Sequence, residues 1–162
     1  MKRALTGEEA ASALREAQAD LDREAAIALG EEGFSIEAEL SRPFTRAFAV
    51  THEGRAAGFL FASAVADELH VVSVVVVPSR RRLGLGRVLV DALLAHAEET
   101  STRLLLLEVR RGNTAAIRLY RQVGFVAVRV RRSYYEDGED AVEMAFASDA
   151  AVLAAFDRVE DL

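Results

Sequence analysis

The chain has 162 residues, of which 51% are hydrophobic and 28% are charged, and its formal net charge is -6. This length and composition predict one globular domain with a sizeable core, and the negative charge argues against nucleic acid as the main partner. The absence of cysteine excludes disulfides, cysteine–zinc sites and thiol catalysis. No apolar run approaches the ~20 residues of a membrane span, and no signal peptide is visible. We therefore expect a cytoplasmic protein without membrane contact.

The N-terminal third of the chain reads as a strand followed by helices. Residues 2–5 suit a short strand, and Thr6 then predicts a helix N-cap, with Glu9 completing a capping box. Ser35 is placed to cap a short second helix that runs through Leu40. The first helix is indicated by an apolar stripe at helical spacing, formed by Ala10, Leu14, Ala17 and Leu21.

The centre of the chain is strand-like. Residues 47–51 and 56–66 flank a turn and predict a hairpin. The valine-rich run 69–77 is apolar on both faces, which predicts a central strand covered on both sides. Pro78 ends this strand, and residues 87–100 have the pattern of an amphipathic helix.

The last part of the chain predicts a further strand at 103–109, a helix at 114–123 and a hairpin of strands 125–131 and 141–147. The expected fold is therefore α/β, a mixed sheet with helices on both faces, in one domain of residues 1–148. Residues 149–162 are expected to form a C-terminal helix or tail.

A glycine loop joins the valine-rich strand to the following helix. Four arginines, Arg80, Arg81, Arg82 and Arg87, lie within eight residues there. Backbone N–H groups of such a loop can converge on one anion, and the helix dipole favours negative charge. A Walker A loop is excluded because its lysine is missing, and a dinucleotide fingerprint because Leu89 stands where its third glycine belongs. A solvated charge run on a plain strand–helix turn remains the alternative.

Glu108 stands in an otherwise apolar strand. A buried carboxylate should be paired or neutral part of the time, and such a group can act as a general base. The alternative is a structural one, in which Glu108 lies at the end of the strand and pairs with Arg110 or Arg111.

Asn113 and Tyr120 are separated by two helical turns and share one helix face. Asn113 is well placed to be the N-cap of its helix, and Tyr120 suits a core aromatic residue with a satisfied hydroxyl. A phenol of pKa near ~10 can also protonate a thiolate leaving group of pKa near ~8.5. Both interpretations of Tyr120 remain open on the residues alone.

The pattern Arg81-x-x-Gly84-x-Gly86, with Asn113, Tyr120 and Gly124-Phe125 behind it, resembles the GNAT acetyltransferases. The resemblance implies a mostly antiparallel sheet whose two parallel strands splay around acetyl-CoA. It implies Glu108 as general base and Tyr120 as general acid, in direct transfer without a metal. The implied cofactor contacts are Val74, Val75, Val76, Arg81, Arg82, Leu83, Gly84, Leu85, Gly86, Arg87, Asn113 and Tyr120.

Residues 131–135 and 139–144, with Leu107-Glu108-Val109-Arg110, are similar to the N-terminal protein acetyltransferases, including the bacterial ribosomal-protein-alanine (RimI) group. The resemblance implies a protein N-terminus or peptide as acceptor, ribosomal protein S18 being one candidate, and Tyr134 and Tyr135 as peptide contacts. Phe34 lies where the bacterial group carries a Pro-Trp signature, so it is expected at the substrate, with the first-residue preference open. A small-molecule amine or lysine acetyltransferase and a non-catalytic acetyl-CoA-binding module remain alternatives, as do a monomer and a homodimer.

Overall fold

The computed structural model describes residues 1–160 and 162, which divide into two compact units. The first unit holds residues 1–64 and 71–96, and the second holds 65–70 and 97–162. Hydrogen bonds order the strands as β1-β2-β3-β4-β5-β7-β6. The pairing of β4 with β5 is parallel, whereas β1–β2, β2–β3, β5–β7 and β6–β7 are antiparallel. The predicted mixed, mostly antiparallel α/β sheet is confirmed.

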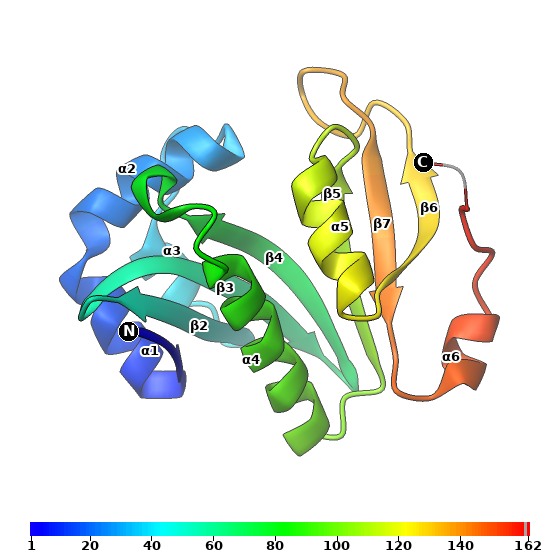
Figure 1. The fold of residues 1–162 in the computed structure, drawn as a ribbon, viewed down its shortest axis with the longest axis horizontal. Helices are drawn as coiled ribbons and strands as arrows, with labels where there is room; N and C mark the ends of the chain where they lie inside the picture. The colour runs from blue at the N-terminus through cyan, green and yellow to red at the C-terminus, as the bar shows by residue number, and fades with distance from the viewer. Residues whose placement is uncertain (161) are drawn as a thin grey trace. The chain divides into compact units, whose positions relative to one another are not determined.

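The first unit is built from elements whose bounds follow those expected within a few residues (Figure 1). They are β1 (Lys2–Thr6), α1 (Gly7–Glu16), α2 (Gln18–Leu29), α3 (Ile36–Leu40), β2 (Thr45–His52), most of β3 (Arg55–Val65) and of β4 (Glu68–Val76), a 3-10 turn (Pro78–Arg80) and most of α4 (Leu85–Glu99).

The core of the first unit lies on both faces of its strands. Helices α1, α2 and α3 cover one face, where Leu14, Leu21 and Ile36 are fully buried in one cluster with Phe59 and Phe61 of β3. Helix α4 covers the other face, where the rings of Phe48 and His96 meet edge to face at 5.5 Å. Burying three large aromatic side chains contributes several kcal/mol of hydrophobic stabilisation in this unit.

Two expectations about the N-terminal helix are wrong. Thr6 occupies the N-cap position of α1 but makes no side-chain capping bond, because Glu9 instead accepts a hydrogen bond from Arg3 at 2.6 Å. The single helix is two helices, since the backbone of Ala17 leaves the helical region and ends α1 there.

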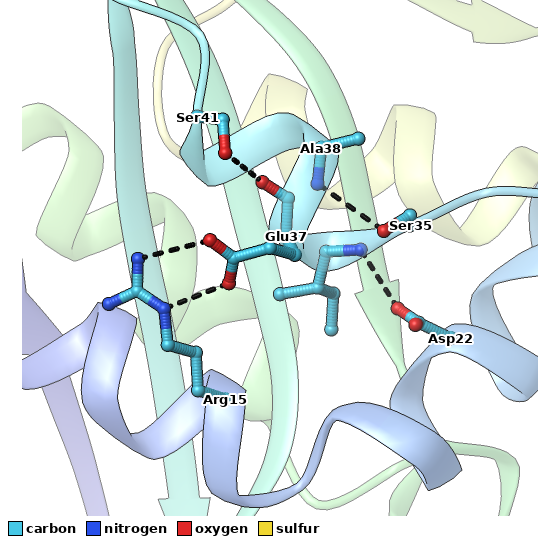
Figure 2. Close-up of polar contacts among 7 residues, drawn as sticks. Arg15, Asp22, Ser35, Glu37, Ala38 and Ser41 are labelled. Atoms are coloured by element: carbon cyan, nitrogen blue, oxygen red, sulfur yellow. Dashed lines mark hydrogen bonds and ion pairs between the residues drawn. The ribbon is translucent and has the colours of Figure 1, made fainter.

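Helix α3 is held in place by polar contacts with α1 and α2 (Figure 2). Ser35 accepts a hydrogen bond from the Ala38 N–H, which confirms it as the N-cap. Asp22 of α2 accepts from the Ile36 N–H at 2.8 Å, and Arg15 of α1 pairs with Glu37 at 2.9 Å. The segment just before α3 is therefore anchored from two sides.

The second unit packs helices on both faces of its strands. It consists of the first residues of β4, β5 (Leu104–Arg110), α5 (Thr114–Gln122), β6 (Val126–Arg131), β7 (Ala141–Phe146) and α6 (Ala150–Ala154). On the α5 face, the ring of Phe125 lies 5.7 Å from that of Tyr120 and 5.5 Å from that of Phe146. On the other face, Leu153 of α6 packs in a cluster with Leu104 and Ala145.

Strands β7 and β4 differ in how far they are buried, and one expectation about them is wrong. The predicted hairpin strand β7 is buried on both faces from Ala141 to Ala145, because it lies between β5 and β6 and helices pack on both sides of the unit. Strand β4 was expected to be covered on both faces, but Val72 is 50% exposed while Leu69 and Val75 are buried. A valine run indicates a strand through its β-branched side chains, whether or not both of its faces are covered.

Candidate functional site

The glycine loop has an open backbone suited to an anion. Arg82 and Gly84 both adopt positive φ, 62° and 75°, and α4 begins directly after them at Leu85. Residues 81 to 84 are exposed, and a Cβ added at Gly84 would meet only the Lys2 ammonium, at 3.4 Å. Left-handed residues beside a helix N-terminus form a concave nest of N–H groups. The loop therefore fits the pyrophosphate expected there.

The four arginines of the loop are not equivalent. Arg80 pairs with Glu53 at 2.7 Å, and Arg87 pairs with Asp91 of its own helix at 2.8 Å. Arg81 donates from Nε to the Val76 carbonyl at 3.1 Å. Within residues 1–160 and 162, no ion pair neutralises Arg81 or Arg82, so these two carry the positive charge that an anion would meet.

Lys2 is a further cation at the loop that the sequence did not indicate. Its ammonium donates a hydrogen bond to the Leu83 carbonyl. The two residues are 81 positions apart, and only the folding of β1 in the same unit brings them together. A lone lysine in a short strand carries no local signal of this kind.

Strand β4 meets its neighbour β3 at unusually close range. A Cβ added at Gly58 would lie 2.5 Å from the Val75 carbonyl oxygen, so only glycine fits there. Val77 donates to the Ala57 carbonyl at 2.9 Å. On the other side, the pairing of β4 with β5 covers Glu68 to His70 only. The splay around Val74 and Val76 involves both units and stays a prediction.

The Glu108 side chain is exposed, so the expectation that it is buried is wrong. Its neighbours Leu107 and Val109 point to the opposite face and are buried, at 2% and 7% exposure. The alternative pairing with Arg110 or Arg111 is not what the structure shows. Arg110 binds Asp137 and Glu139, at 2.8 and 2.7 Å, and Arg111 binds Asp140.

Asn113 and Tyr120 occupy the positions expected of them on α5. The Asn113 side chain accepts a hydrogen bond from the Ala116 N–H at 3.2 Å, which confirms it as the N-cap. Tyr120 is buried, and burial raises the pKa of its phenol to about 12, with a smaller contribution from Tyr135. The phenol therefore keeps its proton at neutral pH and remains available as a donor.

The connection between β6 and β7 carries the tyrosine pair. The rings of Tyr134 and Tyr135 are perpendicular at 5.1 Å, and the Arg110 guanidinium lies 4.0 Å from the centre of the Tyr135 ring. Glu139 accepts from both Arg110 and the Gly112 N–H. These two donors, the arginine first, lower the pKa of Glu139. The connection between β6 and β7 is therefore bonded to Arg110 and Gly112 at the end of β5.

Phe34 lies in the first unit, between α2 and α3. Its ring stacks on that of Phe59 at 5.7 Å with an interplanar angle of 7°. Phe34 directly precedes Ser35, the N-cap of α3, whose first turn is held by the contacts in Figure 2. Phe34 and the glycine loop thus belong to one unit, and Glu108, Asn113, Tyr120, Tyr134 and Tyr135 belong to the other.

The histidines have structural contacts. His52 lies 2.8 Å from Arg80 and His70 lies 3.0 Å from Glu68. Among residues 1–160 and 162, no group of three or more histidine, aspartate or glutamate side chains is arranged to hold a metal ion. None of the helices in that same part of the chain is long and apolar enough to cross a membrane.

Residues 9–125 match the model of the acetyltransferase (GNAT) family. The chain belongs to this family. Membership of this family makes it an acyltransferase. The predicted resemblance to the RimI group is confirmed by its similarity to proteins of that group.

Three proteins illustrate the relationship. The ribosomal protein bS18-alanine N-acetyltransferase of Escherichia coli K12 is 42% identical over 101 residues, which cover 60% of this chain and 68% of that protein. The crystal structure of the E. coli ribosomal-protein-S18-alanine enzyme matches 91% of this chain and 94% of its own, with a TM-score of 0.72 and 31% identity. An N-alpha-acetyltransferase of Sulfurisphaera tokodaii is 47% identical over 77 residues, 47% of this chain and 46% of that protein. A nourseothricin acetyltransferase structure matches 66% of this chain and 67% of its own, with a TM-score of 0.60 and 32% identity.

Proposed function

We propose that this protein transfers the acetyl group of acetyl-CoA to the N-terminal α-amine of a protein, with Glu108 as general base and Tyr120 as general acid. The glycine loop, with Arg81 and Arg82, would bind the pyrophosphate of the cofactor.

The observation that carries the proposal is the arrangement of Glu108 and Tyr120 around β5. Glu108 shares its face with Leu106, which packs in the α6 cluster. Tyr120 lies on the α5 face with Phe125 and Phe146. Burial and a contribution from Glu108 both raise the pKa of Tyr135, which in turn influences Tyr120. Glu108 thus lies on one face of β5, and Tyr120 lies on the α5 side of the same unit.

This arrangement matches what acetyl transfer requires. The amine attacks the thioester carbon and forms a C–N bond, while the C–S bond breaks. The Glu108 carboxylate takes the proton that the amine loses, and the Tyr120 phenol gives its proton to the departing thiolate. Acid and base serve the sulfur and the nitrogen of the tetrahedral intermediate, which are bonded to the same carbon, so the mechanism requires both side chains to reach that one carbon.

The base favours an α-amine over a lysine side chain. An α-amine of pKa near ~8 needs about 1.4 kcal/mol to lose its proton at pH 7, whereas a lysine of pKa near ~10.4 needs roughly 4.6 kcal/mol. An exposed carboxylate such as Glu108 is a modest base and suits the smaller cost. The relatives named for ribosomal protein bS18-alanine and for N-alpha acetylation support the same class of acceptor, with the N-terminus of S18 as one candidate.

A second candidate acceptor is a small-molecule amine. The likeness to a nourseothricin acetyltransferase, at 32% identity over two thirds of the chain, favours it. The tyrosine hairpin favours the peptide, because paired aromatic rings grip an extended backbone with little loss of entropy.

One assay separates these acceptors. The enzyme is given acetyl-CoA with an alanine-first peptide that contains a lysine, the same peptide with its N-terminus blocked, or a free polyamine. Mass spectrometry then locates the acetyl group. We expect acetylation of the first peptide at its α-amine only. Transfer to the lysine or the polyamine alone would reassign the acceptor, and cofactor binding without any transfer would indicate a non-catalytic module.

Replacing the base tests the mechanism. Glu108→Gln should lower kcat by ~100-fold or more and leave cofactor affinity nearly unchanged. Glu99→Gln, which neutralises an exposed carboxylate at the end of α4, is the matched control and should keep wild-type activity. Unchanged turnover in Glu108→Gln would remove this residue from the mechanism.

A further inference from the structure

A second carboxylate lies directly across the sheet from Glu108. In the antiparallel pairing of β5 with β7, Glu108 is in register with Glu143, so both side chains project from the same face. Residues paired in this way have Cβ atoms about 5 Å apart, and like charges there oppose each other. Glu143 is also buried, at 8% exposure, where an unpaired charge would be costly.

Arg131 of β6 offsets the charge of Glu143. Its Nε donates to the Glu143 carboxylate at 2.9 Å, and the carboxylate side chain is only 11% exposed. The pKa of Arg131 is raised, first by its hydrogen bond and charge interaction with Glu143, and to a smaller extent by the charge of Glu108. The guanidinium is therefore bonded to Glu143, which lies across the sheet from Glu108. The Cζ atom of Arg131 also lies 5.6 Å from the centre of the Tyr134 ring, and this contact helps to orient the guanidinium.

Other charged and titratable groups lie on β5 itself, on the neighbouring strand β4, on β6 and on the connection between β6 and β7. Arg110 lies on the same face of β5, but Asp137 and Glu139 bind it. On β4, His70 is in register with Leu106 and bonded to Glu68. The remaining groups are Arg129, in register with Glu143 on β6, and Tyr134 and Tyr135 on the connection to β7.

From this arrangement we propose that Glu143 and Arg131 are positioning residues that set how readily Glu108 accepts a proton. Glu143 alone would make Glu108 harder to ionise, and Arg131 alone would make it easier. The two side chains are held together at 2.9 Å, so Glu108 faces one group of each charge. The inference rests on the proposed function in taking Glu108 as the base, but the charge balance itself exists without any acceptor.

The experiment follows the Glu108 carboxyl group directly. The protein is labelled with carbon-13 at the glutamate carboxyl positions and titrated by NMR, and the signal that disappears in Glu108→Gln identifies Glu108. Glu143→Gln should lower the midpoint of that titration, and Arg131→Gln should raise it. The double variant should return it near the wild-type value. Arg103→Gln, which breaks an exposed ion pair elsewhere in the second unit, is the control and should not move it.

Shifts of opposite sign support the proposal, because a purely structural role would move both single variants the same way or neither. Equal midpoints in all variants, or shifts of the same sign, overturn it. If a variant unfolds, Glu143→Met and Arg131→Met keep the side-chain volume and supply the same comparison. The acid limb of the kcat/KM profile should move with the midpoint in the same variants. Absence of acetyl transfer in the wild type would instead refute the proposed function, and the NMR result would stand by itself.

Discussion

The Arg110 guanidinium lies 4.0 Å from the centre of the Tyr135 ring and binds Asp137 and Glu139 on the same hairpin. This one side chain joins the strand that carries Glu108 to the connection that carries the tyrosines. The second unit therefore holds Glu108 and the aromatic pair in one connected group of side chains.

Removing that link should weaken peptide binding. Arg110→Gln loses a cation–π contact worth about 1 kcal/mol and two partly exposed ion pairs, with Asp137 and Glu139. We expect the KM for the peptide to rise by roughly tenfold, with kcat and the KM for acetyl-CoA changed far less. Steady-state kinetics with each substrate varied in turn measures this. Arg103→Gln is the control, and an unchanged peptide KM in Arg110→Gln would contradict a role for the hairpin.

The glycine loop is tested by two glycines with the same backbone conformation. Gly84 and Gly54 have φ of 75° and 76°, so alanine strains the backbone equally at either position, by about 1 kcal/mol. Only Gly84→Ala should also raise the KM for acetyl-CoA, by an expected fivefold or more, on the order of 1 kcal/mol. Gly54→Ala, in the turn between β2 and β3, should lower stability alone. Equal cofactor KM values in the two variants would argue against binding at the loop.

The raised pKa of Tyr120 predicts that the free energy of unfolding decreases at alkaline pH. Its phenol titrates near ~10 in the unfolded chain and at about 12 in the folded protein. The folded state thus holds the proton more tightly. This stabilisation is complete below pH ~10 and is lost as the pH rises to ~12, amounting to roughly 2–3 kcal/mol.

Denaturant unfolding of wild type and Tyr120→Phe through this range measures the difference. The phenylalanine variant should lose less stability than wild type over the window, while Tyr134→Phe, which removes an exposed hydroxyl, serves as the control. Parallel curves for wild type and Tyr120→Phe would show that burial does not hold the Tyr120 proton. At neutral pH, Tyr120→Phe should lower kcat by ~100-fold without a matching loss of cofactor affinity.

The close approach of β3 and β4 predicts a destabilising substitution outside the reacting groups. Gly58→Ala would bring a methyl group to 2.5 Å from the Val75 carbonyl oxygen, so one strand must move. Overpacking of this kind costs about 1–3 kcal/mol, measurable as a lower midpoint of thermal unfolding. Ser63→Ala, a small change on the same strand, is the control and should remain within about 0.5 kcal/mol of wild type. An unaltered midpoint for Gly58→Ala would mean that the two strands separate at no cost.

The sequence predicted best what depends on neighbouring residues. Helix α5 and its Asn113 cap follow from spacing and capping within a few positions, and both were correct. The capping box at Thr6 did not form, because Arg3 in the preceding strand binds the side chain of Glu9. The sequence did not indicate Lys2 or Glu143, because their partners, Leu83 and Arg131, lie on other elements of the chain.

Burial was harder to predict than element type. Apolar runs located β4 and β7 correctly, but the position of a strand in the sheet decides which of its faces is covered. Glu108 illustrates the difference, because a carboxylate among leucines suggests a buried charge, whereas alternation along β5 turns it outward.

The hydrogen bond from Arg81 to the Val76 carbonyl links the two ends of the proposed cofactor site. When the guanidinium turns towards a pyrophosphate, the strand carbonyl loses its donor and becomes free to accept one from an amide of the pantetheine arm. Filling either half of the site then prepares the other half, so ADP and pantetheine should each bind more tightly when the other is present. The coenzyme would be recognised as a whole molecule, and its separate pieces would compete with it poorly.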